Sequence, residues 1–190
     1  MVSSKDSVVI VSAKRSAIGS FCGSLSSLPA HEIGSEVIKD IIKKTAIDAS
    51  EIDEVILGQV LTAGQGQNPA RQAAIKAGVP VEKTALGINQ VCGAGLRAVA
   101  MGMQQLSMGD ANVIIAGGQE SMSLSHHASN MRNATKMGNT EFIDTMIKDG
   151  LWDAFHGYHM GVTAENVAKK FNISREEQDV FAVNSQNKAE

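Results

Sequence analysis

The residue best suited to covalent chemistry is Cys92, in the segment Asn-Gln-Val-Cys-Gly-Ala-Gly-Leu-Arg at residues 89–97. An apolar run that predicts a strand, residues 85–89, comes before it, and a small-residue run that predicts a helix, residues 94–107, comes after it. The thiol is therefore expected near a helix N-terminus, where unpaired backbone N–H groups and the helix dipole favour an anion. A thiolate is the nucleophilic form of cysteine, and the same N–H groups could stabilise an oxyanion when a carbonyl is attacked. The position of Cys92 alone does not show that it is catalytic, because most cysteines before a helix are inert core thiols.

Strands and helices alternate through the first part of the chain. Residues 8–11, an unbroken β-branched run, predict a buried strand, and apolar residues at helical spacing from Ile33 to Ile42 predict an amphipathic helix. Asn68 and Pro69 are typical of the N-cap and first residue of a helix that runs to residue 77. Further strands are predicted at residues 54–60, 85–89 and 113–118. This alternation predicts an α/β fold with a mostly parallel sheet.

The helix predicted after Cys92 is apolar nearly all round, so we expect it to be buried between layers of the fold. Gly102 stands in its middle, where glycine costs about 1 kcal/mol relative to alanine. A close approach of another backbone at Gly102 is the expected compensation.

The pattern changes after Gly118. Residues 119–139 have weak periodicity and are expected to form a loop, and the chain becomes helical again from Thr163. Ser174 and Glu177 have the spacing of a capping box at the start of the last helix. Because no stop signal follows that helix, the chain is expected to be cut rather than finished.

Composition excludes several function classes. The formal net charge is −3, and no basic run with interleaved aromatic residues predicts a nucleic-acid partner. Two cysteines make no disulfide framework, and neither a signal-peptide pattern nor an apolar stretch of membrane-spanning length is present. A cytoplasmic protein with no membrane partner is therefore expected. The spacing of His156 and His159 could suggest a metal pair, but no Asp, Glu or Cys in a ligand pattern supports one.

The surroundings of Cys92 resemble the active-site segment of the thiolases, the acyl-CoA C-acyltransferases. The resemblance continues in Ala-Gly-Gly-Gln-Glu-Ser-Met-Ser at residues 116–123, which is similar to the family's glycine-glycine segment. Residues 157–166 match the histidine-methionine-glycine segment of the short-chain biosynthetic thiolases. Residues 12–19, 66–73 and 174–190 also fit. The match covers essentially the whole chain and resembles the N-terminal half of a thiolase.

The resemblance implies a thiolase-like layered α/β fold in which the helix after Cys92 is the buried catalytic helix. It implies that residues 1–118 form an incomplete N-terminal thiolase domain. Residues 119–190 would then be the first part of an inserted loop domain, which contributes to the coenzyme A site and to assembly.

The implied activity is that of an acetyl-CoA C-acetyltransferase. Cys92 would accept the acetyl group of acetyl-CoA, and its main-chain N–H would help to hold the oxyanion. The enolate of a second acetyl-CoA would then form acetoacetyl-CoA, or the reverse thiolysis would occur. His159, Met160 and Leu151 would line the cavity for the pantetheine arm and thioester, although any of them could instead be core. No metal or cofactor is expected, because coenzyme A is part of the substrate.

The resemblance also implies a homo-oligomer, a dimer of dimers. The sequence around His126 and His127 by itself favours a solvated or interface loop, but the resemblance implies that this region is the hairpin that joins thiolase dimers into tetramers. Gln67, Asn68 and Arg71 resemble residues near the dimer interface. Cys22 has no motif around it and is expected to be structural.

The chain departs from the family pattern in three ways. Ala94 stands where serine is usual, and Gln119 stands where methionine is frequent. Thiolases are also about twice this length. The resemblance implies that the missing half would carry the histidine that activates the nucleophile and the second cysteine, so the 190-residue chain alone is expected to be inactive. Two alternatives stay open: a broader 3-ketoacyl-CoA thiolase of fatty-acid degradation, and a non-catalytic fragment or assembly subunit.

Overall fold

The computed structural model describes residues 7–133 and 135–189, and the chain divides into two compact units between Met146 and Ile147. The N-terminal unit contains the sheet and the first helices, and the C-terminal unit is helical. The predicted boundary at Gly118 concerns domains rather than compact units, and it stays a prediction. The elements are α1 (Ala30–Thr45), a 3₁₀ turn (Ala49–Glu51), β1 (Glu54–Gly58), α2 (Pro69–Lys76), β2 (Thr84–Ile88), α3 (Ala94–Met108), β3 (Ile114–Gly118), a 3₁₀ turn (Met122–Leu124), β4 (His127–Ala128), β5 (Ile143–Asp144), a π-helix (Met146–Leu151), α4 (Met160–Phe171) and α5 (Arg175–Ala189).

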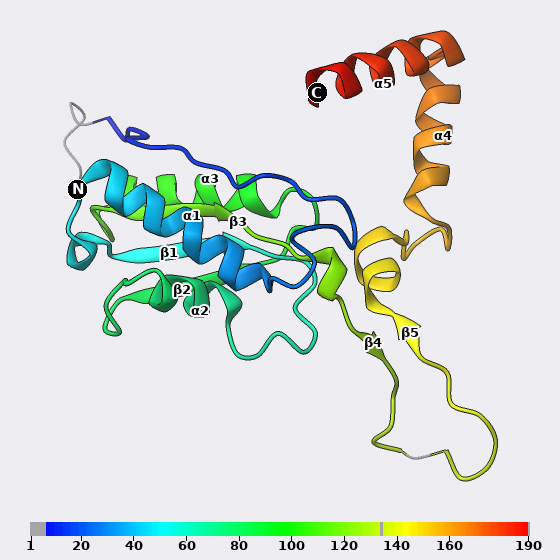
Figure 1. The fold of residues 1–190 in the computed structure, drawn as a ribbon, viewed down its shortest axis with the longest axis horizontal. Coiled ribbons are helices and arrows are strands. Elements are labelled where there is room, and N and C mark those ends of the chain that lie inside the picture. The colour runs from blue at the N-terminus through cyan, green and yellow to red at the C-terminus, as the bar shows by residue number, and fades with distance from the viewer. Residues whose placement is uncertain (1–6, 134, 190) are drawn as a thin grey trace. The chain divides into compact units, whose positions relative to one another are not determined.

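The predicted parallel sheet is present in the N-terminal unit (Figure 1). Among the described residues its strand order is β2-β1-β3, and β1 is hydrogen-bonded in parallel to both neighbours. Glu54 of β1 lies opposite Thr84 of β2 and Ile114 of β3, so the three strands start and end in step. Parallel pairing requires crossovers, and here they are α2 and α3.

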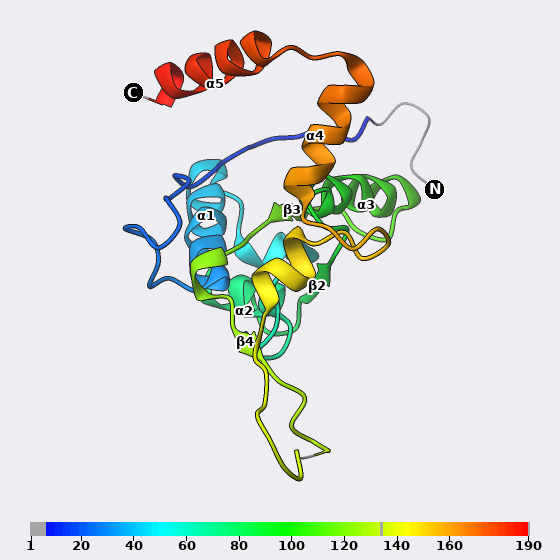
Figure 2. The ribbon, with the colours of Figure 1, turned by 90° about the vertical axis from the view of Figure 1, so that its right-hand side faces the viewer.

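Helices cover both faces of this sheet, with α1 and α2 on one side and α3 on the other (Figure 2). The alternation of side chains along a strand assigns residues to each face. Val55 and Leu57 of β1 and Ile115 of β3 belong to the core formed with α1 and α2. The alternate positions face α3, where Gln105 donates to the Glu54 carboxylate at 2.7 Å.

Burial of small apolar residues holds the core together. Val55 and Ile56 are fully buried in β1, and α2 contributes Ala70, Ala73 and Ala74. Since alanine brings little bulk, α2 can lie close to the sheet. Among the described residues, this core contains no aromatic side chain, in keeping with an aromatic content of 4%.

The predicted first strand is wrong. Residues 8–11 form no strand in the structure, and their side chains are 40% to 77% exposed. A β-branched run favours extended backbone, but a strand also needs a neighbouring backbone to pair with. Nothing in the local sequence of residues 8–11 supplies that partner.

Both predicted helix starts are confirmed. Asn68 Oδ1 accepts the N–H of Arg71 at 3.1 Å, and Pro69 is the first residue of α2. The Ser174 hydroxyl accepts the Glu177 N–H at 3.1 Å, while the Glu177 carboxylate accepts the Ser174 N–H at 2.8 Å. These reciprocal bonds are the capping box that the sequence predicted.

The region predicted to be a loop after Gly118 contains one short antiparallel pair, in which His127 of β4 lies opposite Asp144 of β5. Thr145 bonds back to the carbonyl of His126 through both its N–H and its hydroxyl. These bonds close the base of a hairpin, in the region where the family resemblance places one. Within the described residues, no helix is long and apolar enough to cross a membrane.

Replacing Asn68 with alanine should destabilise the fold by about 1–2 kcal/mol, because the cap of α2 is lost. Two further effects add to this cost: Asn68 Nδ2 donates to the carbonyl of Ala85 at 3.0 Å, and Asn68 has a φ of 41°. The measurement is the free energy of unfolding in urea. Asn68→Gly separates the causes, since glycine tolerates positive φ but forms neither side-chain bond. Equal stability of Asn68→Ala and the unchanged chain would contradict the assignment.

Candidate active site

Cys92 lies on a tight turn between β2 and α3, two residues before the first residue of the helix. We call residues 89–93 the Cys92 turn. Asn89 Oδ1 accepts the N–H of Val91 at 2.9 Å, and the carbonyl of Gln90 accepts the N–H of Gly93 at 3.1 Å. The thiol is free and exposed. The sequence prediction of a thiol at a helix N-terminus is therefore confirmed.

Val91 carries the conformational cost of this turn. Its φ is 49°, in the left-handed region that a β-branched residue rarely adopts. Residues in such conformations persist only where the surrounding structure holds them, and they gather at functional sites. The strain turns the chain sharply from the strand into the helix, and Cys92 follows directly after it.

Three glycines explain how α3 begins so close to the sheet. We call Gly58, Gly95 and Gly118 the glycine contact. A Cβ at Gly58 would lie 2.5 Å from the carbonyl carbon of Ala94, and a Cβ at Gly118 would lie 3.3 Å from the Cα of Gly95. The backbone of the first turn of α3 thus rests directly on the ends of β1 and β3. Larger side chains at these positions would push Cys92 away from the strand ends.

The expected close approach of another backbone at Gly102 is wrong. A Cβ there would meet the side chains of Ile114 and Ala116 at 3.2 and 3.6 Å, rather than another backbone. The close backbone approach lies two turns earlier, at Gly95. The helix is also not covered all round: Ala98 is fully buried, but Leu96 is 79% exposed. Apolar composition predicted burial of the whole helix, whereas the sheet covers one face of it.

Side-chain hydrogen bonds join the segment that follows β1 to the segment that follows β3. Gln119 Nε2 donates to Gln59 Oε1 at 2.9 Å, and Gln59 Nε2 donates to the carbonyl of Leu61 at 3.0 Å. The Glu120 carboxylate accepts the N–H groups of Val60 at 2.8 Å and Leu61 at 3.2 Å. The loop after β1 is therefore fixed to the loop after β3.

Burial raises the pKa of Glu120 above its usual value, although the N–H groups of Val60 and Leu61 act in the opposite direction. Desolvation penalises the ionised form, and two backbone donors compensate for only part of that penalty. A charged Glu120 therefore costs stability that a protonated Glu120 does not.

The other three predicted site residues lie in the C-terminal unit. Trp152 and His159 form an antiparallel bridge, which joins the chain segment that contains Leu151 to the one that contains Met160. Leu151 is partly buried, whereas Met160 is 40% exposed. The structure thus groups Leu151, His159 and Met160 with one another, while Cys92 belongs to the other unit.

His159 is the N-cap of α4. Its Nδ1 accepts the N–H of Gly161 at 3.0 Å. A ring nitrogen can accept only when it carries no hydrogen, so the ring hydrogen lies on Nε2. His159 can thus donate one hydrogen bond from Nε2 to a polar group of a ligand.

A second histidine of this unit has a partner that the sequence reading overlooked. Asp153 Oδ2 lies 2.9 Å from His156 Nδ1, and Asp153 Oδ1 accepts the N–H groups of Phe155 and His156. These bonds lower the pKa of Asp153. The spacing of His156 and His159 therefore reflects an Asp–His pair and an N-cap. Among the described residues, no group of three or more His, Cys, Asp and Glu side chains is arranged to hold a metal.

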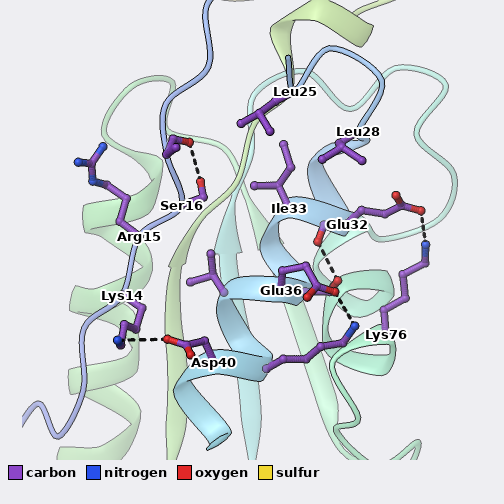
Figure 3. A pocket seen from close by; sticks show the side chains of 14 residues that line it. Lys14, Arg15, Ser16, Leu25, Leu28, Glu32, Ile33, Glu36, Asp40 and Lys76 are labelled. Carbon is purple, nitrogen blue, oxygen red and sulfur yellow. Dashed lines mark hydrogen bonds and ion pairs between the residues drawn. The ribbon is translucent and has the colours of Figure 1, made fainter. Parts of the chain in front are cut away.

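One cavity, of about 770 Å³, lies between residues 14–17 and α1 (Figure 3). Ion pairs cross its walls, among them Lys14–Asp40 at 3.1 Å and Lys76–Glu32 at 2.6 Å. None of the four predicted site residues lines it. It is therefore separate from the Cys92 turn.

Sequence reasoning missed the glycine contact and the glutamine pair. Gly58 and Gly118 are each the last residue of an apolar strand. A glycine at such a position can indicate that another backbone approaches closely, and this signal was available in the sequence. Gln59 and Gln119 gave no such signal, because glutamines after strands are usually solvated.

Together these features define a class: an α/β protein with an exposed cysteine on a strained strand–turn–helix connection. The chain matches the family model "Thiolase, N-terminal domain" over residues 8–190. It therefore belongs to the thiolase family.

The chain is also similar in sequence to curated relatives over nearly its whole length. An acetyl-CoA acetyltransferase of Rhizobium meliloti is 63% identical over 187 residues, which is 98% of this chain and 48% of that protein. One from Shinella zoogloeoides is 62% identical, over 98% of this chain and 47% of its own length. A mouse protein named "Acetyl-CoA acetyltransferase, cytosolic" is 51% identical over the whole chain and 48% of its own length. The chain thus spans about half the length of these relatives.

Replacing Gly58 with alanine should lower stability by about 1–3 kcal/mol, the usual cost of overpacking. The new methyl group would lie 2.5 Å from the Ala94 carbonyl carbon, so α3 must shift. Gly117→Ala is the matched control, because a Cβ there meets no atom within 4 Å. The measurement is the urea unfolding midpoint of both variants. If both lose equal stability, the close approach at Gly58 is not the cause.

The raised pKa of Glu120 predicts a specific pH dependence. Its folded pKa lies above its unfolded value of about 4.5, so its contribution to stability is full below that value. That contribution is lost as the pH rises through the folded pKa. Glu120→Gln cannot ionise, so its stability relative to the unchanged chain should increase from about pH 4.5 towards neutrality. Urea unfolding across this pH range measures the difference, and a constant or falling difference would refute the prediction.

Proposed function

We propose that the protein to which this chain belongs is an acetyl-CoA C-acetyltransferase, with Cys92 as the residue that accepts the acetyl group. The observation that carries the proposal is the exposed thiol on the strained turn before α3. Relatives named acetyl-CoA acetyltransferase, at 51% to 63% identity, support the substrate.

In the first step, the Cys92 sulfur attacks the carbonyl carbon of acetyl-CoA. A carbon–sulfur bond to Cys92 forms and the bond to the coenzyme A sulfur breaks, while the thiol proton ends on the departing coenzyme A. The main-chain N–H of Cys92 would help to hold the oxyanion that precedes this departure. The sharp turn at Val91 exposes the thiol to a substrate as large as a thioester.

In the second step, a second acetyl-CoA loses a proton from its methyl carbon, and the enolate attacks the acetyl group on Cys92. Acetoacetyl-CoA leaves, and the proton removed from the methyl carbon returns to the Cys92 sulfur, which restores the thiol; thiolysis is the reverse. The family resemblance implies that residues outside this chain would supply the proton transfers.

Leu151, His159 and Met160 would contact the pantetheine arm. Leu151 and Met160 offer apolar surface, and His159 offers one hydrogen bond from Nε2. An acyl-CoA site needs this mixture of apolar wall and a few fixed polar groups. Coenzyme A enters as part of the substrate, and the proposal includes no other cofactor.

The proposal extends to a cytoplasmic homo-oligomer, a dimer of dimers. The hairpin closed by β4 and β5 supports this assembly, because it stands where the family resemblance places the contact between dimers. Its base is fixed by the hydrogen bond from the Thr145 hydroxyl to the His126 carbonyl.

The test is incorporation of label from acetyl-CoA into the full-length protein. Cys92→Ala should abolish incorporation, whereas Cys22→Ala should retain it, since both thiols are exposed but only Cys92 lies before a helix. Peptide mapping by mass spectrometry locates the label. Label retained in the Cys92 variant would sink the assignment. A clearly higher kcat/KM for long-chain 3-ketoacyl-CoA would favour the broader thiolase instead.

A further inference from the structure

Gln59 and Gln119 form a buried pair of amides, which we call the amide pair. Gln119 Nε2 donates to Gln59 Oε1 at 2.9 Å. The two residues are only 5% and 8% exposed, so the hydrogen bond is shielded from water. A buried hydrogen bond of this kind fixes geometry, because breaking it leaves polar groups unpaired.

The backbone of the amide pair joins all three strands. The Gln59 N–H donates to the carbonyl of Ile88 at 3.0 Å, and the Gln119 N–H donates to the carbonyl of Gly58 at 2.9 Å. Ile88 is the last residue of β2, and the Cys92 turn begins directly after it. Gly58 and Gly118 support the first turn of α3, where the Cys92 turn ends. The main chain of Gln59 and Gln119 is thus connected to both ends of the Cys92 turn, and the amide pair joins these two residues to each other.

A third element confines the side chain of Gln119. Its Oε1 lies against Gly34 of α1, where a Cβ would collide with it. Within the described residues this buried oxygen has no hydrogen-bond partner. Packing by α1 and the bond to Gln59 therefore hold the amide in one orientation.

The strained backbone of Val91 explains why the strand ends around the Cys92 turn need to be held in place. A β-branched residue at a φ of 49° relaxes unless both ends of its turn are held. We propose that Gln119 is a positioning residue, which acts through Gln59 and the strand ends to hold the Cys92 thiol at the start of α3. The inference rests on Cys92 being the reactive thiol of the proposed function.

The test measures how fast iodoacetamide alkylates Cys92 at neutral pH. Every protein is full-length and carries Cys22→Ser, and peptide mapping by mass spectrometry reports alkylation of Cys92 separately from that of any cysteine outside this chain. Gln119→Met keeps the length of the side chain but removes the amide. The rate should fall about threefold to tenfold, which is less than the ~100-fold cost of a 1 Å misplacement in catalysis. The physical reason is that a relaxed turn no longer holds the thiol in the exposed position that it has before α3.

Two further variants separate positioning from stability. Ser35→Ala loses a different buried bond, from the Ser35 hydroxyl to the Glu32 carbonyl at 2.8 Å, and should leave the rate unchanged. The double variant Gln59→Met/Gln119→Met leaves neither amide unpaired and should regain much of the stability. Alkylation of Cys92 in this double variant should stay slow, because the hydrogen bond between residues 59 and 119 is still absent. Urea unfolding gives the stability of each protein.

The inference fails if the rate recovers together with stability in the double variant, or if Ser35→Ala slows alkylation equally. It fails also if both methionine variants react as fast as the background protein. These outcomes are independent of acetyl transfer. If Cys92→Ala retains the acetyl label while Gln119→Met still slows alkylation, the proposed function is overturned and the positioning role of Gln119 stands.

Discussion

The close approach between the first turn of α3 and the ends of β1 and β3 is the constraint on which the site depends. Side chains normally keep a helix and a sheet apart, but at Gly58, Gly95 and Gly118 backbone meets backbone. The start of α3 is thereby fixed relative to the sheet. Because β2 is hydrogen-bonded to β1, the other end of the Cys92 turn is fixed by the same strands. The turn has little freedom left, and the unfavourable φ of Val91 is the consequence.

The two faces of the sheet have different tasks. The face covered by α1 and α2 holds Val55, Leu57 and Ile115 and supplies the apolar burial that stabilises the fold. The face covered by α3 has small residues near the strand ends, and it sets the position of the thiol. Cys92 therefore lies at the carboxyl ends of parallel strands, where ligand sites of open α/β sheets occur.

Local sequence predicted much of this structure, because local interactions produce it. The helices α1, α2 and α3 and the strands β1, β2 and β3 follow the periodicities read from the chain. The caps at Asn68 and Ser174 each use contacts within three residues. Residues 8–11 failed because a strand needs a partner that local propensity does not supply. Gly102 was misread because composition does not show which face of a helix meets the sheet.

By itself, the sequence determined the order of the elements from α1 to β3, the parallel α/β class and the placement of Cys92 before a helix. Each of these depends on residues that are close in the chain. Only the tertiary structure decided that Gln59 and Gln119, 60 residues apart, share a hydrogen bond, and that three glycines from separate elements meet. It also revealed the strain at Val91, which follows from fixing both ends of a short turn. The physical reason is that parallel pairing brings distant strand ends together, and no local pattern specifies which side chains will meet there.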